Sequence, residues 1–132
     1  MFTTLTPDTL YNLTVIDTRL NKVLRSTRYL SLPDRDAEEI RMAIGGDVGL
    51  DVAAKQLTSY LVDYDPHVII IGGDIAYDDG MRTCFYSWDN FYDIFDELNV
   101  KLNRVVPFVL SVGNHDVGFN SLASVSLNFN DT

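Results

Sequence analysis

Three short polar motifs in this chain each follow an apolar run. They are Gly46-Asp47-Val48-Gly49, Gly73-Asp74-Ile75-Ala76-Tyr77 and Gly113-Asn114-His115-Asp116. Their carboxylate, phenol and amide oxygens are hard ligands, which suit iron(III), manganese or magnesium. Hydrolysis of a phosphate ester at two cations about 3.5 to 4 Å apart uses such ligands, including a carboxylate that bridges both ions. The motifs therefore have the character of half a two-metal hydrolytic site.

The apolar runs before the motifs predict three β-strands. They cover Ile40–Ile44, Val68–Ile71 and Val105–Val112, and each run leads into glycine, which is typical of strand ends. In open α/β sheets, ligands bind at the carboxyl ends of the strands. We therefore expect the three motifs to meet at one edge of a sheet.

The segments between the strands have helical periodicity. Apolar side chains recur at helical spacing in two sets: Ala53, Leu57, Tyr60, Leu61 and Tyr64, then Trp88, Phe91, Tyr92, Phe95 and Leu98. Alternation of strand and helix predicts an α/β fold with a parallel sheet and right-handed crossovers. We assign the second, aromatic set to core packing rather than to a cofactor site.

The N-terminal part has a different pattern. Leu10–Leu32 reads as a β-hairpin with a polar turn at Asp17–Lys22, and a lone hairpin is only marginally stable in water. The polar segment Pro33–Glu39 reads as a linker. We place a domain boundary there, and the rest of the chain does not obviously offer a sheet for the hairpin to join.

Composition and charge narrow the classes of partner. The formal net charge of −9 argues against nucleic acid, since binding to a phosphate backbone depends on clustered Lys and Arg. No apolar stretch approaches the roughly 20 residues of a membrane span. Met1–Leu10 has neither the basic nor the apolar segment of a signal peptide. The one cysteine, Cys84, excludes an internal disulfide framework and reads as a small buried apolar residue.

The motifs G-D-x-G, G-D-x-x-Y and G-N-H-[D/E], in this order, resemble the first three motifs of the purple acid phosphatases within the calcineurin-like metallophosphoesterases. The resemblance spans Ile40–Asp116 and includes Ser87-Trp88-Asp89 and Val106-Pro107-Phe108. It implies that residues 40–132 form the N-terminal, incomplete portion of a metallophosphoesterase α/β sandwich. Residues 1–33 would then be the end of a preceding β-sandwich-like domain.

The resemblance also implies a role for each motif residue. Asp47 would ligate an iron(III) ion, and Asp74 would bridge it to a divalent zinc, manganese or iron ion. Tyr77 would bind the iron(III) as a phenolate, which a phenol with a pKa near 10 becomes only beside strong positive charge. Asn114 would ligate the divalent ion. His115 would face a small phosphate monoester and stabilise or protonate its leaving group.

The family completes its site with further histidines, and the only histidines here are His67 and His115. His67 lies at the entry to a predicted strand, opposite the motif edge, and reads as structural. We therefore expect this chain to be a fragment or truncated product of an active enzyme type, and to be inactive alone.

Two other functions stay open at this stage. One is a metallophosphoesterase that cleaves phosphodiesters or nucleotides, although Tyr77 favours the acid phosphatase branch. The other is a non-catalytic truncated relative, whose cut sheet would expose an apolar face and an unpaired strand edge. The family favours a secreted or vacuolar location, but the sequence identifies neither the location nor the oligomeric state.

Several of these residues also have plainer interpretations. Asp47 alone could be a helix N-cap, and Gly113–Asp116 could be an Asx turn. For Asp78 and Asp79 we favour solvated loop positions over a role in orienting ligands.

Overall fold

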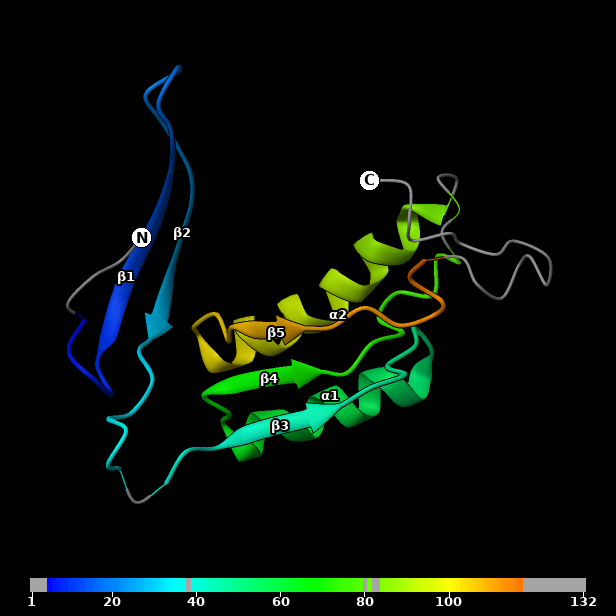
Figure 1. The fold of residues 1–132 in the computed structure, drawn as a ribbon. Coiled ribbons are helices and arrows are strands. Elements are labelled where there is room, and N and C mark those ends of the chain that lie inside the picture. The colour runs from blue at the N-terminus through cyan, green and yellow to red at the C-terminus, as the bar shows by residue number, and fades with distance from the viewer. Residues whose placement is uncertain (1–4, 38, 80, 82–83, 118–132) are drawn as a thin grey trace, which may run out of the picture.

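A computed structural model describes residues 5–37, 39–79, 81 and 84–117. The Ser- and Asn-rich tail and the end of the predicted second domain lie outside these residues. The chain forms an antiparallel hairpin followed by a three-stranded parallel sheet with two helices (Figure 1). The predicted α/β fold, a partial metallophosphoesterase fold with an N-terminal hairpin, is therefore confirmed.

The hairpin consists of β1 (Leu10–Asp17) and β2 (Lys22–Leu30). Its strands pair from Leu10 opposite Leu30 to Asp17 opposite Lys22. The Asp17 carboxylate closes the turn, because its Oδ1 accepts the backbone N–H groups of Arg19 at 2.8 Å and Leu20 at 3.1 Å. The hairpin and its turn lie where the sequence predicts them.

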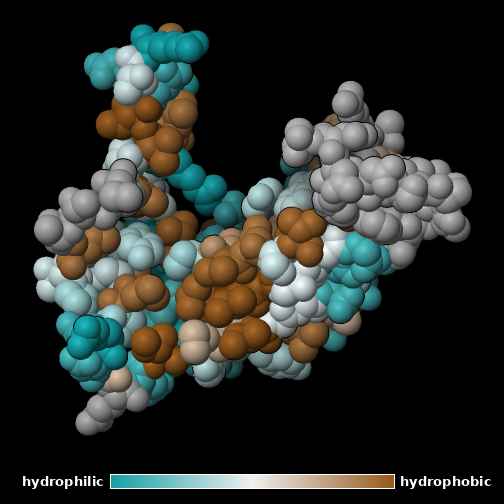
Figure 2. Space-filling view, in the orientation of Figure 1, coloured by the Kyte–Doolittle hydropathy of each residue, from teal (hydrophilic) through white to brown (hydrophobic). Residues whose placement is uncertain are grey.

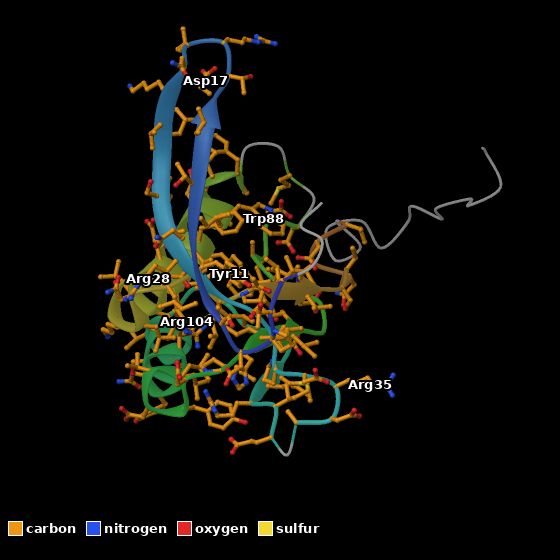
Figure 3. All side chains as sticks on the ribbon, turned by 90° about the vertical axis from the view of Figure 1, so that its left-hand side faces the viewer. Tyr11, Asp17, Arg28, Arg35, Trp88 and Arg104 are labelled. Atoms are coloured by element: carbon orange, nitrogen blue, oxygen red, sulfur yellow. The ribbon has the colours of Figure 1, made fainter. Side chains whose placement is uncertain are left out.

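The hairpin does not stand alone, because β2 contacts the segment after the second helix. The Val105 N–H donates to the Arg28 carbonyl at 2.8 Å, and the Arg28 Nε donates to the Asn103 carbonyl at 2.9 Å (Figure 3 labels Arg28). Arg25 also forms an exposed ion pair with Asp96 at 3.1 Å. A few polar contacts thus replace the sheet partner that the sequence does not supply.

The parallel sheet has the strand order β3 (Met42–Gly45), β4 (Val68–Ile71) and β5 (Phe108–Leu110). The last strand is shorter than the predicted Val105–Val112. Val105 pairs with the hairpin instead, and the Val106 N–H donates to Asn99 Oδ1 at 3.0 Å. Pro107 has no N–H to offer to a strand ladder. The register with β4 therefore starts at Phe108 opposite Ile69, and the Pro107 carbonyl accepts the Ile69 N–H at 3.0 Å.

Both helices, α1 (Val52–Tyr64) and α2 (Tyr86–Leu102), cover the same face of the sheet (Figure 1). The Asp51 carboxylate caps α1 by accepting the Ala54 N–H at 3.0 Å, so Asp47 is not the N-cap. The helices and sheet share a core of Ala54, Ile69, Ile71, Ile75, Ala76, Phe91, Ile94, Phe95, Leu98 and Val106. Within the described residues, neither helix is long and apolar enough to cross a membrane.

The buried face of α1 agrees only in part with the predicted one, because the predicted Leu61 packs against the core. Ala54 and Thr58 are buried, whereas Leu57 and Tyr60 remain 67% and 68% exposed. The helix lies behind β3 in the view of Figure 1, and β3 is an edge strand, so among the described residues no further strand covers the outer flank of the helix. In α2 the aromatic prediction is confirmed for Phe91 and Phe95 and wrong for the half-exposed Tyr92.

The opposite face of the sheet carries an apolar surface that no described element covers. Met42, Ile44 and Val109 are 45%, 70% and 54% exposed. Figure 2, in the same orientation as Figure 1, shows this surface as a continuous hydrophobic patch. β3 and β5 are the two open edges of the described sheet. The apolar face and the open strand edges that we expected for a cut sheet are thus present.

A charged cluster lies at the amino end of the sheet, opposite the motifs. Asp65 ends α1 with left-handed backbone, and its carboxylate accepts from Arg104 at 2.7 Å and from Arg41 at 3.1 Å. His67 is buried beside it, and its Nδ1 accepts the Arg41 backbone N–H at 3.0 Å. Burial and the charge of Arg41 lower the pKa of His67. The structural role expected for His67 is therefore confirmed.

We predict that Asp65→Asn destabilises the fold by about 2 kcal/mol at neutral pH, because it leaves the buried Arg104 without its counter-charge. Burial tends to raise the pKa of Asp65, but the hydrogen bond and charge of Arg104 and the charge of Arg41 outweigh it and hold the pKa below its ordinary 3.8. A carboxylate whose pKa is lowered by folding stabilises the fold at pH values above its ordinary pKa. This stability is lost as the pH falls through the folded-state pKa.

Urea unfolding of both proteins across the acid range measures this effect. The gap between wild type and Asp65→Asn should be full at neutral pH and should close as the pH falls from 3.8 through the lower folded-state pKa, where Asp65 becomes protonated in the folded protein too. Asp63→Asn makes the same change at an exposed position of α1 and should have little effect. A gap that does not vary with pH would contradict the prediction.

Candidate metal centre

The three motifs lie where β3, β4 and β5 end, at one edge of the sheet (Figure 1). The loops after β3 and β4 continue to bond to each other beyond the strands. The Gly72 N–H donates to the Gly45 carbonyl at 2.7 Å, and the Asp47 N–H donates to the Gly73 carbonyl at 3.2 Å. The backbone itself therefore places Asp47 next to the Asp74 loop.

Tyr77 connects the first motif to the third. Its hydroxyl donates to Asp47 Oδ1 at 3.0 Å, and its ring packs on the His115 ring with centroids 4.6 Å apart. Asp47, Tyr77 and His115 come from three different strand ends, so the predicted convergence of the motifs is observed for these residues.

Asp74 meets the third motif at very close range. Its Oδ1 accepts the His115 backbone N–H at 2.8 Å. A Cβ on Gly113 would overlap the carboxylate and backbone nitrogen of Asp74. Gly73 has a φ of +102°, and a Cβ there would lie 2.9 Å from Gly113 Cα. Both glycines are therefore required for the loops after β4 and β5 to touch.

Asp116 holds these two loops together. Its Oδ1 accepts the Ile75 N–H at 2.9 Å, and its Oδ2 accepts the Gly113 N–H at 2.8 Å. One carboxylate thus binds one backbone donor in each loop. Hydrogen bonds of this charge-assisted kind are short and strong, so Asp116 fixes the distance between the second and third motifs.

The backbone is left-handed at several site residues. Asp47, Asp74, Tyr77 and Asp79 have φ values of 50°, 50°, 52° and 52°. Aspartate tolerates this region through local hydrogen bonds, whereas tyrosine there is uncommon. Each such residue costs on the order of 1 kcal/mol, and the cost is sustained only where surrounding contacts impose the conformation. Strain of this kind clusters at functional sites.

The loop after Tyr77 is bound to its surroundings, which corrects our interpretation of Asp78 and Asp79 as solvated. The Trp88 Nε1 donates to Asp78 Oδ2 at 2.8 Å, and His115 Nδ1 lies 2.6 Å from Asp79 Oδ1. The hydrogen bond to Asp79 and the charges of Asp74 and Asp79 raise the pKa of His115. Asp79 therefore orients the imidazole and stabilises its protonated form.

The site is strongly electronegative. Burial, the hydrogen bond to Asp47, and the charges of Asp47, Asp74 and Asp116 raise the pKa of Tyr77 to about 12. A phenol in this environment keeps its proton unless a cation enters. The Asp47 carboxylate facing the Tyr77 phenol at 3.0 Å fits a hard, highly charged cation, whose own charge would lower the pKa of the phenol instead.

The ligand set is nevertheless partial. In the part of the chain that the structure describes, no three Asp, Glu, His or Cys side chains converge to hold a metal ion. The candidate set depends on Tyr77 beside Asp47, on Asp74, and on Asn114. Asn114 is exposed, and its neighbours Gly113 and His115 both contact the Asp74 loop. The donors of this candidate set are oxygens, which fit a hard cation.

Sequence reasoning missed three residues that organise the site. From sequence, Asp116 has no predicted role of its own, Asp79 is expected to be solvated, and Trp88 is expected to serve packing alone. An acidic residue three positions after Gly113 could have been recognised as an acceptor for the N–H of that glycine. Nothing in the sequence pairs Asp79 with His115 or Trp88 with Asp78, because these partners are 36 and 10 residues apart.

Comparison with known proteins identifies the family of this chain. Residues 40–131 match the calcineurin-like phosphoesterase family, which is well over half of the chain. The chain is also 29% identical over 105 residues to purple acid phosphatase 23 of Arabidopsis thaliana. That alignment covers 67% of this chain and 23% of the plant protein, so the chain spans about a quarter of the length of this relative. By the family match over residues 40–131, the chain belongs to the calcineurin-like phosphoesterases.

Proposed function

We propose that this chain carries the first half of the binuclear metal centre of an acid phosphatase that hydrolyses phosphate monoesters. The observation that carries the proposal is the junction of three strand-end loops through the Tyr77–Asp47 and His115–Asp74 hydrogen bonds, at 3.0 and 2.8 Å. Residues 1–33 would belong to a preceding β-sandwich-like domain. Residues 40–132 would be the N-terminal portion of the catalytic domain.

Each motif residue has a role in this proposal. Asp47 and Tyr77 would hold an iron(III) ion, Asp74 would bridge both ions, and Asn114 would ligate zinc, manganese or a second iron. When bound, the two cations would supply Lewis acidity toward the phosphate oxygens and the attacking water. His115, held at Nδ1 by Asp79, would give a proton from Nε2 to the leaving-group oxygen.

The family membership supports metal-dependent phosphoester hydrolysis, and the name of the plant relative supports the acid phosphatase type. Completion of the centre requires nitrogen ligands beyond the two histidines of this chain. His67 is buried at the opposite edge of the sheet, and we assign His115 to the substrate. We therefore propose that the chain alone binds metal but does not turn over phosphate esters.

We predict that the chain loaded with iron(III), supplied as its citrate complex, shows a visible charge-transfer band from a bound phenolate. Tyr77→Phe should abolish the band, because it removes the phenol oxygen that faces Asp47. Tyr60→Phe removes a phenol that is 68% exposed on α1, and it should keep the band. Absorption spectra at equal iron loading measure both effects.

A band that persists in Tyr77→Phe, or one that is absent from the iron-saturated wild type, would contradict the ligand assignment. Release of p-nitrophenol from p-nitrophenyl phosphate by the chain alone, with iron and zinc present, would instead contradict the proposal that the chain carries only half of the site.

We also predict that Gly113→Ala weakens manganese or zinc binding about tenfold or more, within the usual range for lost ligand support. The added methyl group would collide with Asp74 and push the loops after β4 and β5 apart. Gly45→Ala is the matched control, because a Cβ there meets nothing within 4 Å. Isothermal titration calorimetry gives the affinities, and equal affinities for the two variants would refute the prediction.

A further inference from the structure

The three consecutive residues Tyr77, Asp78 and Asp79 are each anchored to a different element. Tyr77 bonds to Asp47 after β3, and Asp79 contacts His115 after β5. Asp78 accepts from the Trp88 indole of α2 at 2.8 Å. Of these three anchors, Trp88 is the one that lies in a helix. The other two lie in loops that themselves belong to the candidate site.

Trp88 is well placed to act as a fixed point. It lies in the first turn of α2, and its half-buried ring packs edge-on against Phe91, with centroids 6.1 Å apart at 73° (Figure 3 labels Trp88). Phe91 is fully buried in the core shared by the helices and the sheet. The indole N–H therefore projects from a rigid part of the fold toward the loop.

The loop is strained on both sides of the residue that Trp88 holds. Tyr77 and Asp79 have left-handed backbone, with φ of 52° at each. Such conformations persist only where surrounding contacts impose them. Loss of the Trp88–Asp78 bond would remove a side-chain restraint between these two strained residues, which would let the Tyr77 hydroxyl move from Asp47 and the Asp79 carboxylate move from His115.

We propose that Trp88 is a positioning residue of the metal centre, which acts by holding Asp78 through its indole N–H. The inference rests on the proposed function, because it assigns Trp88 to that same site. It goes beyond the motif residues, since Trp88 lies on a helix and its indole binds Asp78, which is not one of the four candidate ligands.

The test compares four variants of the chain. Trp88→Phe keeps an aromatic ring in the packing position but removes the N–H donor, and Asp78→Ala removes the acceptor. Asp78→Asn keeps an acceptor oxygen and should rescue the contact. Tyr92→Phe changes another aromatic ring of α2 and serves as control. Circular dichroism establishes that each variant is folded, and if Trp88→Phe does not fold, Asp78→Ala carries the test.

The first readout is nuclear magnetic resonance of the histidine rings in the metal-free chain. In Trp88→Phe and Asp78→Ala, the ring nitrogen signals of His115 should shift toward those of a solvated imidazole. They should stay at wild-type values in Asp78→Asn and Tyr92→Phe. His67, buried at the far edge of the sheet, is an internal reference that should not move in any variant.

The second readout is manganese or zinc affinity by calorimetry, which should fall about tenfold in the two disrupting variants, as for other lost supports of metal ligands. His115 signals that stay unchanged in both disrupting variants would overturn the inference, whatever the metals do. Shifted His115 signals in a chain whose wild type binds neither ion would support the positioning role and refute the proposed function. The two failures are therefore distinguishable.

Discussion

The contact on which the candidate site depends is the pair of hydrogen bonds that Asp116 accepts from Ile75 and Gly113. A parallel sheet aligns strand ends, but it does not hold the loops beyond them together. Asp116 supplies that contact, and the absence of a side chain at Gly113 allows it to be short. The other links between the second and third motifs, from Asp74 to the His115 backbone and from Asp79 to its ring, exist because these two loops touch.

The amino edge and the carboxyl edge of the sheet, where the strands begin and end, have different roles in the fold. At the amino edge, Asp65 is bound by Arg104 and Arg41 beside the buried His67, and charges there are compensated. At the carboxyl edge, burial and the carboxylates of Asp47, Asp74 and Asp116 raise the pKa of Tyr77, and negative charge is in excess. Strained backbone also gathers at the carboxyl edge. Charge is thus balanced at the amino edge, whereas uncompensated negative charge and strained backbone lie together at the carboxyl edge, where we propose the metal centre.

Local pattern was sufficient to predict the hairpin, the order of strands and helices, and the meeting of the motifs. The length of β5 could not be predicted, because its expected first residues bond elsewhere. Val105 bonds to Arg28, which is distant in sequence, and Val106 bonds to Asn99 of α2. The exposed flank of α1 was not predicted for a related reason. Helical periodicity places Leu57 on an apolar face, but it does not show whether another element packs beside that face. The roles of Asp79 and Trp88 depend on tertiary contacts that leave no pattern in the sequence.

The sheet face around Met42, Ile44 and Val109, which no described element covers, has a consequence for the behaviour of the chain in solution. Apolar patches on two copies attract each other at contact, whereas a net charge of −9 keeps copies apart at longer range. Added salt screens the repulsion and leaves the apolar attraction in place. Self-association of this chain should therefore increase with ionic strength, which is the reverse of what charge pairing between copies would give.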